Sequence, residues 1–226
     1  MHPLDNPAWS ALTTEQANIA VGNDEAKRYA PDILPFAGLA RPEAAAAASL
    51  DPLFTPGETF YLIGDIPPLP AGWRLENELP CAQLLAPENL HCMQQATEPI
   101  VPLGPADRDE MFQLINSTQP GYYHRETRQT GAYFGIRRQG RLVSMAGERM
   151  RMTGFSELSA ICTDPGFTGH GYAQQLIAWL CRKQVAGGIT PFLHVSLVNQ
   201  RALRLYVHLG FRHRREITFR RIRKTS

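Results

Sequence analysis

Long apolar runs are absent from this 226-residue sequence. No stretch approaches the roughly 18 apolar residues that would span a bilayer, and Met1–Ser10 lacks the basic and apolar segments of an export signal. Cysteine is also scarce, because the chain has only Cys81, Cys92, Cys162 and Cys181, without a C-x-x-C pair or metal-ligand spacing. We therefore expect a reduced, cytoplasmic protein with buried thiols, no membrane span and no metal site.

Acidic residues are missing from the C-terminal part of the chain, where none lies between Asp164 and Glu216. Residues 165–226 hold 11 Lys or Arg against 1 Glu, whereas residues 1–100 hold 4 Lys or Arg against 13 Asp or Glu. A basic block of this kind favours a polyanionic partner, such as a phosphorylated cofactor, a membrane surface or nucleic acid. Packing against the acidic first half would explain it equally well, so charge alone does not choose between these interpretations.

The first hundred residues are rich in proline and alanine and contain no recognisable chemical constellation. The prolines of residues 66–70 exclude a helix there, because proline lacks the backbone donor and clashes with the preceding turn. We predict a structural or substrate-shaping α/β half-domain over residues 1–98. Its predicted elements are helices at 7–20 and 42–50 and buried strands at 59–63 and 81–86.

A second unit is predicted over residues 99–226, because the sequence pattern changes near residues 98–102. Its apolar spacing alternates between the period of a helix and that of a strand, with turn residues between the segments. The order β-α-β-β-β-α-β-α-β predicts a mixed α/β layer. The predicted elements are a strand at 101–103, a helix at 106–115, a hairpin of 133–136 and 142–148, a strand at 157–163, a helix at 171–185, a strand at 192–197, a helix at 200–209 and a strand at 214–222.

A glycine-rich segment, residues 165–173, lies between a predicted strand and a predicted helix. Glycines before a helix let several N–H groups turn toward one point, and the helix N-terminus favours an anion such as pyrophosphate there. No Gly-Lys-Ser/Thr follows, which excludes a P-loop, and Gln174 replaces the third glycine of the dinucleotide fingerprint. The alternative is a glycine turn that only allows close packing of the strand and the helix.

Three segments of the second unit resemble the GNAT superfamily of N-acetyltransferases. Residues 168–173, Thr-Gly-His-Gly-Tyr-Ala, match its pyrophosphate loop, (Arg/Gln)-x-x-Gly-x-(Gly/Ala), except that Thr168 replaces the first Arg or Gln. Residues 199–211 match its Asn-x-x-Ala-x-x-x-Tyr-x-x-x-Gly-Phe ending. With residues 156–163, the chain is most similar to the glycine N-acyltransferase-like branch. The resemblance implies a GNAT-like mixed central sheet flanked by helices, with residues 1–98 as a degenerate GNAT-like repeat.

The resemblance also implies a reaction, the transfer of an acyl group from acetyl-CoA, or from another acyl-CoA, to a primary amine by direct attack within a ternary complex; we expect the group to be acetyl. The amine must lose a proton, since an alkylammonium has a pKa near ~10, and the departing thiolate gains from a proton donor. Tyr206 matches the family's position for that acid. Glu157, at the head of a central strand, is the candidate general base, with Glu148 and water as alternatives.

Cofactor contacts follow from the same resemblance. The strand over residues 158–163 is expected to diverge from its neighbour and to offer free backbone groups to the pantetheine arm, with the Cys162 N–H as an oxyanion donor. The Cys162 side chain lies in an apolar strand and is expected to be an inert buried thiol. The predicted cofactor-binding residues are Ile161, Cys162, Thr163, Thr168, Gly169, His170, Gly171, Tyr172, Ala173 and Asn199.

The candidate contacts to the acceptor amine come from one loop and from Glu148. Residues 122–127 fall where the family's acceptor-binding loop lies, so Tyr123, Arg125 and Glu148 are candidate substrate contacts, although a plain surface loop fits equally well. The rival function is a non-catalytic acyl-CoA-binding sensor or regulatory module. Nucleic-acid binding is not expected, because no stacking aromatics interleave the C-terminal arginines. A homodimer is an expectation drawn from the family alone.

Overall fold

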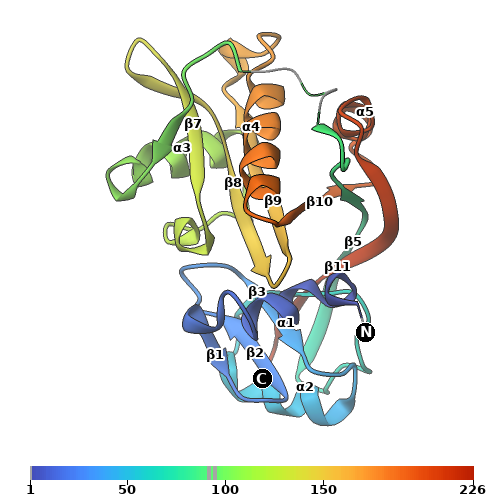
Figure 1. Ribbon diagram of the computed structural model, residues 1–226. Coiled ribbons are helices and arrows are strands. Elements are labelled where there is room, and N and C mark those ends of the chain that lie inside the picture. The colour runs from blue at the N-terminus through green and yellow to red at the C-terminus, as the bar shows by residue number, and fades with distance from the viewer. Residues whose placement is uncertain (1, 91–92, 94–95) are drawn as a thin grey trace.

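The computed structural model of the chain describes residues 2–90, 93 and 96–226, so Cys92 lies outside the described residues. Within them, eleven strands form one mixed sheet in the order β1-β2-β3-β4-β11-β5-β10-β9-β8-β7-β6 (Figure 1). None of the described helices is long and apolar enough to cross a membrane. The strands are β1 (Ala20–Gly22), β2 (Ala26–Tyr29), β3 (Phe36–Leu39), β4 (Thr59–Ile63), β5 (Trp73–Leu85), β6 (Val101–Leu103), β7 (Tyr133–Arg138), β8 (Arg141–Met152), β9 (Phe155–Thr163), β10 (Thr190–Ser196) and β11 (Arg212–Lys224). The α-helices are α1 (Pro7–Leu12), α2 (Ala44–Leu50), α3 (Arg108–Thr118), α4 (Tyr172–Ala186) and α5 (Gln200–His208).

The second half of the chain follows the predicted order of elements. From β6 to β11 the structure has β-α-β-β-β-α-β-α-β, which confirms the prediction. The helices were readable because each buries one face. In α4, for example, Leu176, Ile177 and Leu180 are completely buried, and their spacing forms one apolar stripe along the helix.

The first half contains more strand than the sequence predicts, because β1, β2 and β3 were not expected. Each of these strands has only three or four residues, too few for an alternating pattern to stand out. The predicted helix over residues 7–20 was too long, since α1 ends at Leu12. The hydroxyls of Thr13 and Thr14 donate to the carbonyls of Trp9 and Ser10 at 2.8 and 2.6 Å, and such bonds compete with continuation of a helix.

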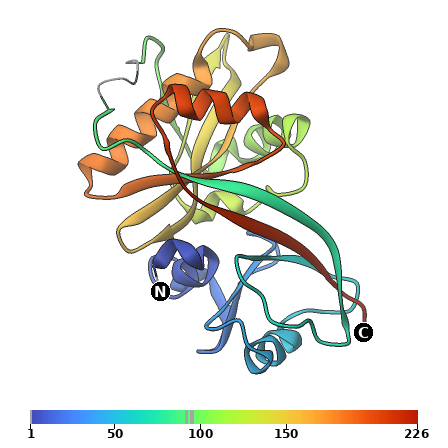
Figure 2. The same cartoon turned by 90° about the vertical axis from the view of Figure 1, so that its right-hand side faces the viewer.

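β5 connects the two halves of the sheet. It pairs antiparallel with β10 on one edge and with β11 along the other edge. β5 and β11 are two long strands that run side by side through both halves of the molecule (Figure 2). β4 then pairs with β11 and carries the sheet on to β3. A strand from the first half of the chain therefore lies between two strands of the second half, and the domain division at residue 98 stays a prediction.

Helices cover both faces of the sheet in the second half. α3 packs Met111 and Leu114 against a cluster that contains Met145 of β8. α4 packs Leu176 against a cluster that contains the next residue of the strand, Ala146. Adjacent residues of a strand point to opposite faces, so α3 and α4 lie on opposite sides of the sheet.

β9 and β10 separate part-way along their length. They pair in parallel only at Phe155↔Thr190, Ser156↔Pro191 and Glu157↔Phe192, although β9 continues to Thr163 and β10 to Ser196. β10 stays paired with β5 as far as Ser196. The edge of β9 that faces β10 is therefore outside the ladder from residue 158 onward, which confirms the predicted divergence.

A β-bulge bends β9 beside this gap. Met145 faces Cys162 and Gly147 faces Ser159, so two residues of β9 lie opposite the single residue Ala146. One of the two is Ala160, whose φ of 51° is in the left-handed region that residues with a Cβ rarely adopt. A bulge bends its strand and leaves an extra residue unpaired, so it adds free backbone groups at the gap.

We predict that a fragment of residues 99–226 does not fold on its own. Without β5, β10 and β11 lose their shared partner, and Ala82 and Leu84 are removed from the core cluster that contains Leu193. Circular dichroism should show no cooperative thermal transition for the fragment, whereas the full chain should melt cooperatively. Co-expression with residues 1–98 should restore a folded complex. A cooperative transition of the fragment alone would contradict the role given to β5.

Candidate functional site

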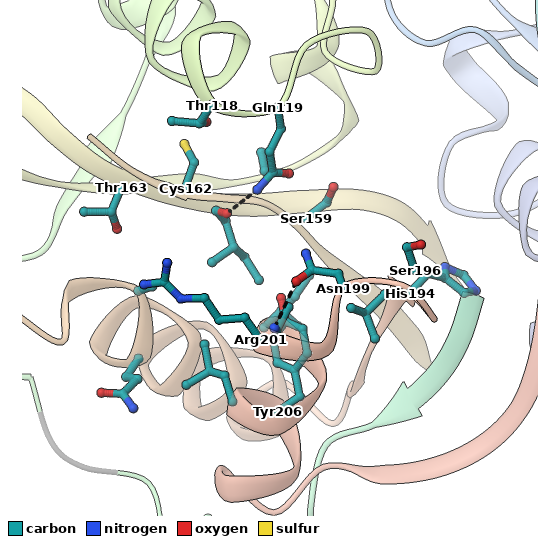
Figure 3. Close-up of a pocket in the computed structure, with 18 of the residues that line it drawn as sticks. Thr118, Gln119, Ser159, Cys162, Thr163, His194, Ser196, Asn199, Arg201 and Tyr206 are labelled. Carbon is teal, nitrogen blue, oxygen red and sulfur yellow. Dashed lines mark hydrogen bonds between the residues drawn. The ribbon is translucent and has the colours of Figure 1, made fainter. Parts of the chain in front are cut away.

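The gap between β9 and β10 opens into a cavity of about 620 Å³. Its walls are residues 158–163 of β9, the end of β10, the loop before α4, and α5; Figure 3 shows the side chains around it. Among the described residues, no Asp or Glu lines this cavity, whereas Arg149 and Arg201 do. The cavity therefore combines free backbone groups with positive charge, and it suits an anionic or strongly polar ligand.

The predicted pyrophosphate loop lies at one end of the cavity. Gly169 and Gly171 have φ values of 84° and 73°, which glycine adopts without strain. α4 begins immediately after Gly171 and has no side-chain cap, so the N–H groups of its first turn have no partner within the helix. His170 is not in the lining, and its ring stacks on Tyr172 with centroids 5.3 Å apart. The lining residues of the loop are Thr168, Gly169, Gly171, Tyr172 and Ala173.

The β9 wall contributes Ile161, Cys162 and Thr163. Gln119, directly after α3, donates from Nε2 to the free carbonyl of Ile161 at 3.1 Å (Figure 3). Burial raises the pKa of the Cys162 thiol to about 12. The thiol is therefore protonated at neutral pH, as expected of an inert cysteine.

α5 contributes Asn199 and Tyr206 to the opposite wall. Asn199 caps the helix, because its side-chain oxygen accepts from the Ala202 N–H at 3.1 Å. Tyr206 is buried, and burial raises the pKa of its phenol to about 12. The hydroxyl therefore keeps its proton at neutral pH, which a general acid requires before it donates.

Glu157 is completely buried in an ion pair. Arg149 donates to both of its carboxylate oxygens, at 2.8 Å from Nε and 2.6 Å from Nη2, and His194 Nδ1 lies 2.7 Å from Oε1. Burial alone would raise the pKa of Glu157, but Arg149 and His194 outweigh it and hold the pKa well below its usual range. The carboxylate is thus ionised and bonded on both oxygens, and it does not line the cavity.

The remaining predicted residues lie in three different environments. Tyr123 borders a second, smaller cavity of about 60 Å³, which shares Arg149 with the larger one. Arg125 does not line either of these two cavities, since its guanidinium pairs with Asp109 at 2.9 Å on the surface. Glu148 is also absent from both linings, and its carboxylate accepts from Gln184 of α4 at 2.9 Å. The structure therefore brings only Tyr123 of these three near the site.

Several cavity residues were missed by the sequence analysis. His194 and Ser196 are two positions apart on β10 and share one face, so the alternation within the predicted strand was the available signal. Ser196 Oγ is buried and has no hydrogen-bond partner among the described residues. Gln119 and Arg201 carried no signal, because only the fold brings the end of α3 and the start of α5 to the same cavity.

Comparisons with known proteins agree with this geometry. The FR47-like protein family matches residues 133–220. A GNAT-family structure from Novosphingobium aromaticivorans, assigned as an acetyltransferase, is 35% identical, with a TM-score of 0.90 over 100% of both chains. The chain belongs to the GNAT family. As a GNAT protein it is an acyl-CoA-dependent N-acetyltransferase, of a family that generally uses acetyl-CoA and transfers the acyl group to an amine.

More distant structures share the GNAT fold. A GCN5-related N-acetyltransferase from Kribbella flavida is 15% identical, with a TM-score of 0.60 over 96% of this chain and 92% of its own. A GNAT-family acetyltransferase from Colwellia psychrerythraea is 14% identical, with a TM-score of 0.53 over 65% of this chain and 57% of its own. No curated protein matches the chain. These comparisons do not identify the acceptor amine, so its binding site is inferred from the geometry of the cavity.

We predict that Glu157→Gln destabilises the protein by about 3–5 kcal/mol, because the substitution leaves the buried Arg149 without its counter-charge. The folded-state pKa of Glu157 lies below that of the unfolded chain, so its contribution is complete at neutral pH and is lost as the pH falls. The variant should therefore lose less stability than the wild type between about pH 5 and about pH 3. Urea unfolding across this range measures both effects.

The matched control is Glu148→Gln, because Glu148 accepts hydrogen bonds from neutral groups such as Gln184 and its ion pair, with Arg151, is long at 3.9 Å. It should cost less than Glu157→Gln and leave the acid-induced loss as in the wild type. Equal effects of the two substitutions would contradict the assigned ion pair.

Proposed function

We propose that the protein transfers an acetyl group from acetyl-CoA to a primary amine by direct attack, with both substrates held together in the cavity between β9 and β10. The observation that carries the proposal is one cavity with an uncapped helix N-terminus and an unpaired strand edge. The first favours phosphate, and the second offers backbone donors and acceptors to an extended polar chain. Acetyl-CoA contains both kinds of group and, when bound, supplies the activated acetyl thioester.

The loop before α4 would hold the pyrophosphate through the backbone N–H groups of residues 169–173. Thr168 stands where the family has Arg or Gln, and its hydroxyl already donates to the Pro165 carbonyl at 3.2 Å. We therefore assign the anion contacts to the backbone, with Arg201 of α5 as a cationic side chain in the same lining. A backbone nest of this kind remains an anion site without a charged first residue.

The free edge of β9 would hold the pantetheine arm through backbone groups of Ile161 and Thr163. The predicted oxyanion donor, the Cys162 N–H, does not fit this role, because Ser144 Oγ of β8 donates to the Cys162 carbonyl at 2.8 Å and the N–H and C=O of one strand residue point to the same side. Asn199 can still donate from its amide nitrogen, since its cap uses only the side-chain oxygen. These residues lie on both walls of the gap, so a bound cofactor would bridge β9 and α5.

Tyr206 would hold a proton at its hydroxyl for the sulfur that departs. Burial raises the pKa of Tyr206, so the phenol is protonated at neutral pH and its hydroxyl can donate a hydrogen bond to the departing sulfur. Tyr206 also packs edge-on against Phe211, with ring centroids 5.6 Å apart, which fixes the ring on the cavity wall.

Water, rather than a carboxylate, would accept the proton of the amine. The hypothesis that Glu157 is the base meets a physical obstacle, because its ionised carboxylate is saturated by Arg149 and His194 and has a pKa far below neutrality. Glu148 is bonded on the α4 side, away from the cavity. We propose that Glu157 instead fixes Arg149 at the closed end of the cavity.

The acceptor would enter beside Tyr122 and Tyr123, at the end of the cavity that the first half of the chain helps to build. Leu79 lines this end, and the ring of Tyr61 lies 5.3 Å from that of Tyr122. His124 is held against the Pro31 carbonyl at 2.7 Å. We therefore propose that residues 1–98 shape the acceptor site, as in the N-terminal extension of the glycine N-acyltransferase-like branch, to which the 156–163 segment also relates the chain.

Calorimetric titration with acetyl-CoA and with CoA tests the cofactor assignment. Gly171→Glu places a carboxylate at the phosphate end of the cavity, and we expect affinity to fall by at least about tenfold more than in Gly171→Ala. The alanine variant is the control, because it carries the same backbone strain at a φ of 73° without the charge. Absence of binding by the wild type at millimolar ligand would overturn the cofactor site.

Tyr206→Phe tests the acid. With glycine, benzylamine and putrescine as trial acceptors and thiol release as the readout, we expect kcat to fall by about 10²–10⁴-fold while acetyl-CoA affinity is unchanged. The edge-on contact with Phe211 should survive this substitution, so the fold is kept. Tight binding of acetyl-CoA with no turnover of any primary amine would favour the alternative, a non-catalytic acyl-CoA sensor.

A further inference from the structure

A row of polar side chains crosses the closed end of the cavity within the sheet. Gln83 of β5 lies opposite His194 of β10 in the antiparallel register, and the two side chains are 3.0 Å apart. His194 contacts Glu157 of β9, and Glu157 contacts Arg149 of β8. The row therefore links four neighbouring strands, and its members are almost completely buried.

The orientation of the Gln83 amide is fixed by its other two partners. Arg214 Nη1 lies 2.7 Å from the amide oxygen, and an arginine can only donate. The Leu4 carbonyl lies 2.8 Å from the amide nitrogen, and a carbonyl can only accept. Gln83 therefore presents an N–H group, and not its oxygen, to Nε2 of His194.

Arg214 reaches Gln83 because of an irregularity in β11. His213 pairs with Leu84 and Arg215 pairs with Gln83, so Arg214 is the extra residue of a bulge. Bulges re-aim a side chain, and here the guanidinium bridges Gln83 and Asp5, with its Nη2 2.7 Å from Asp5 Oδ1. The amide of Gln83 is thus locked from outside the cavity.

The protonation of His194 follows from these contacts. Nε2 faces an N–H donor and must accept, so the ring proton is on Nδ1, which donates to Glu157 Oε1 at 2.7 Å. The rings of Phe192 and Phe219 pack against the imidazole, with centroids 5.5 and 5.1 Å away. They offer no further partner for a second proton.

Arg149 is the end of the row that reaches the ligand space. Its Nε and Nη2 are bonded to Glu157, whereas Nη1 has no hydrogen bond to any described residue. The guanidinium lies 5.0 Å from the Phe36 ring and 5.7 Å from the Phe219 ring, and these two rings contact each other with centroids 5.9 Å apart, so both pack against the same side of it. Arg149 also lines both the large and the small cavity.

We propose that Gln83 is a positioning residue of the acceptor site, which holds His194 as the neutral Nδ1–H tautomer and thereby keeps Glu157 bonded to Arg149. With one proton on His194, the lone pairs of Glu157 are shared among three fixed donors and Arg149 is held with Nη1 toward the acceptor. A second proton would make His194 a cation that competes with Arg149 for the same carboxylate. The functional part of this inference rests on the acceptor site proposed above.

Nitrogen-15 NMR of the histidine rings tests the tautomer without any assay of activity. At about pH 7.5 the His194 signal, identified by its loss in His194→Gln, should show a protonated Nδ1 and an unprotonated Nε2 in the wild type. Gln83→Glu replaces the N–H donor with a carboxylate, so the variant should show protons on both nitrogens. A protonated Nε2 in the wild type would overturn the proposal even if the variant did not fold.

Steady-state kinetics tests the effect on the acceptor, with the trial amine that the wild type turns over fastest. Gln83→Glu should raise the KM for the amine by about tenfold while the KM for acetyl-CoA changes little. Gln184→Leu removes a similarly buried amide that bonds Glu148 and Ser156 instead, and it should leave both KM values and the His194 tautomer unchanged.

The NMR experiment tests the His194 tautomer, and the kinetic experiment tests the effect of Gln83 on the acceptor. An unchanged amine KM in folded Gln83→Glu would refute the positioning role. Failure of the wild type to turn over any trial amine would count against the proposed function, whereas the NMR result would still decide the tautomer.

Discussion

The site depends on two neighbouring strands, β9 and β10, that pair over only part of their length. β9 and β10 pair through three residues and then separate, while β10 remains paired on its other edge with β5. Because β10 is held by β5 on its other edge, the separation does not unravel the sheet and leaves unpaired the edges of β9 and β10 that face the gap. Backbone groups in such a gap must find other partners, and one carbonyl, that of Ile161, already accepts from Gln119. The remaining groups are available to a ligand, and α4 directs its free N-terminus to the same space.

A buried ion pair lies where the two strands begin to separate. Glu157 is the last residue of β9 that pairs with β10, and its carboxylate binds Arg149 at this point. Removing two charges from water is costly, so a pair of this kind is rarely a net gain in stability over an apolar core. Its three hydrogen bonds and the nearby rings of Phe36 and Phe219 offset part of that cost. We infer that the ion pair serves function instead, because it fixes the Arg149 guanidinium at the closed end of a ligand cavity.

The sequence predicted the parts of the structure that local chemistry determines. Gly169 and Gly171 indicated the loop and α4, and alternation indicated the hairpin of β7 and β8. What it could not predict depends on pairing between distant residues. The contact of Gln83 with His194 joins residues 111 positions apart, and nothing local to either residue indicates it. For the same reason, nothing in the sequence indicated that the Glu157 carboxylate is paired. Its partner Arg149 belongs to β8, and only the pairing of β8 with β9 brings the two side chains together.

The gap between β9 and β10 is where we expect acetyl-CoA to bind. Hydrogen exchange of the amides, measured with and without saturating acetyl-CoA, tests it directly because exchange reports protection residue by residue. We predict slower exchange at residues 158–163 and 169–174, and unchanged exchange at residues 20–39 in the first half of the chain. Protection that avoids both of the first two segments, or that appears only in the first half, would contradict the claim.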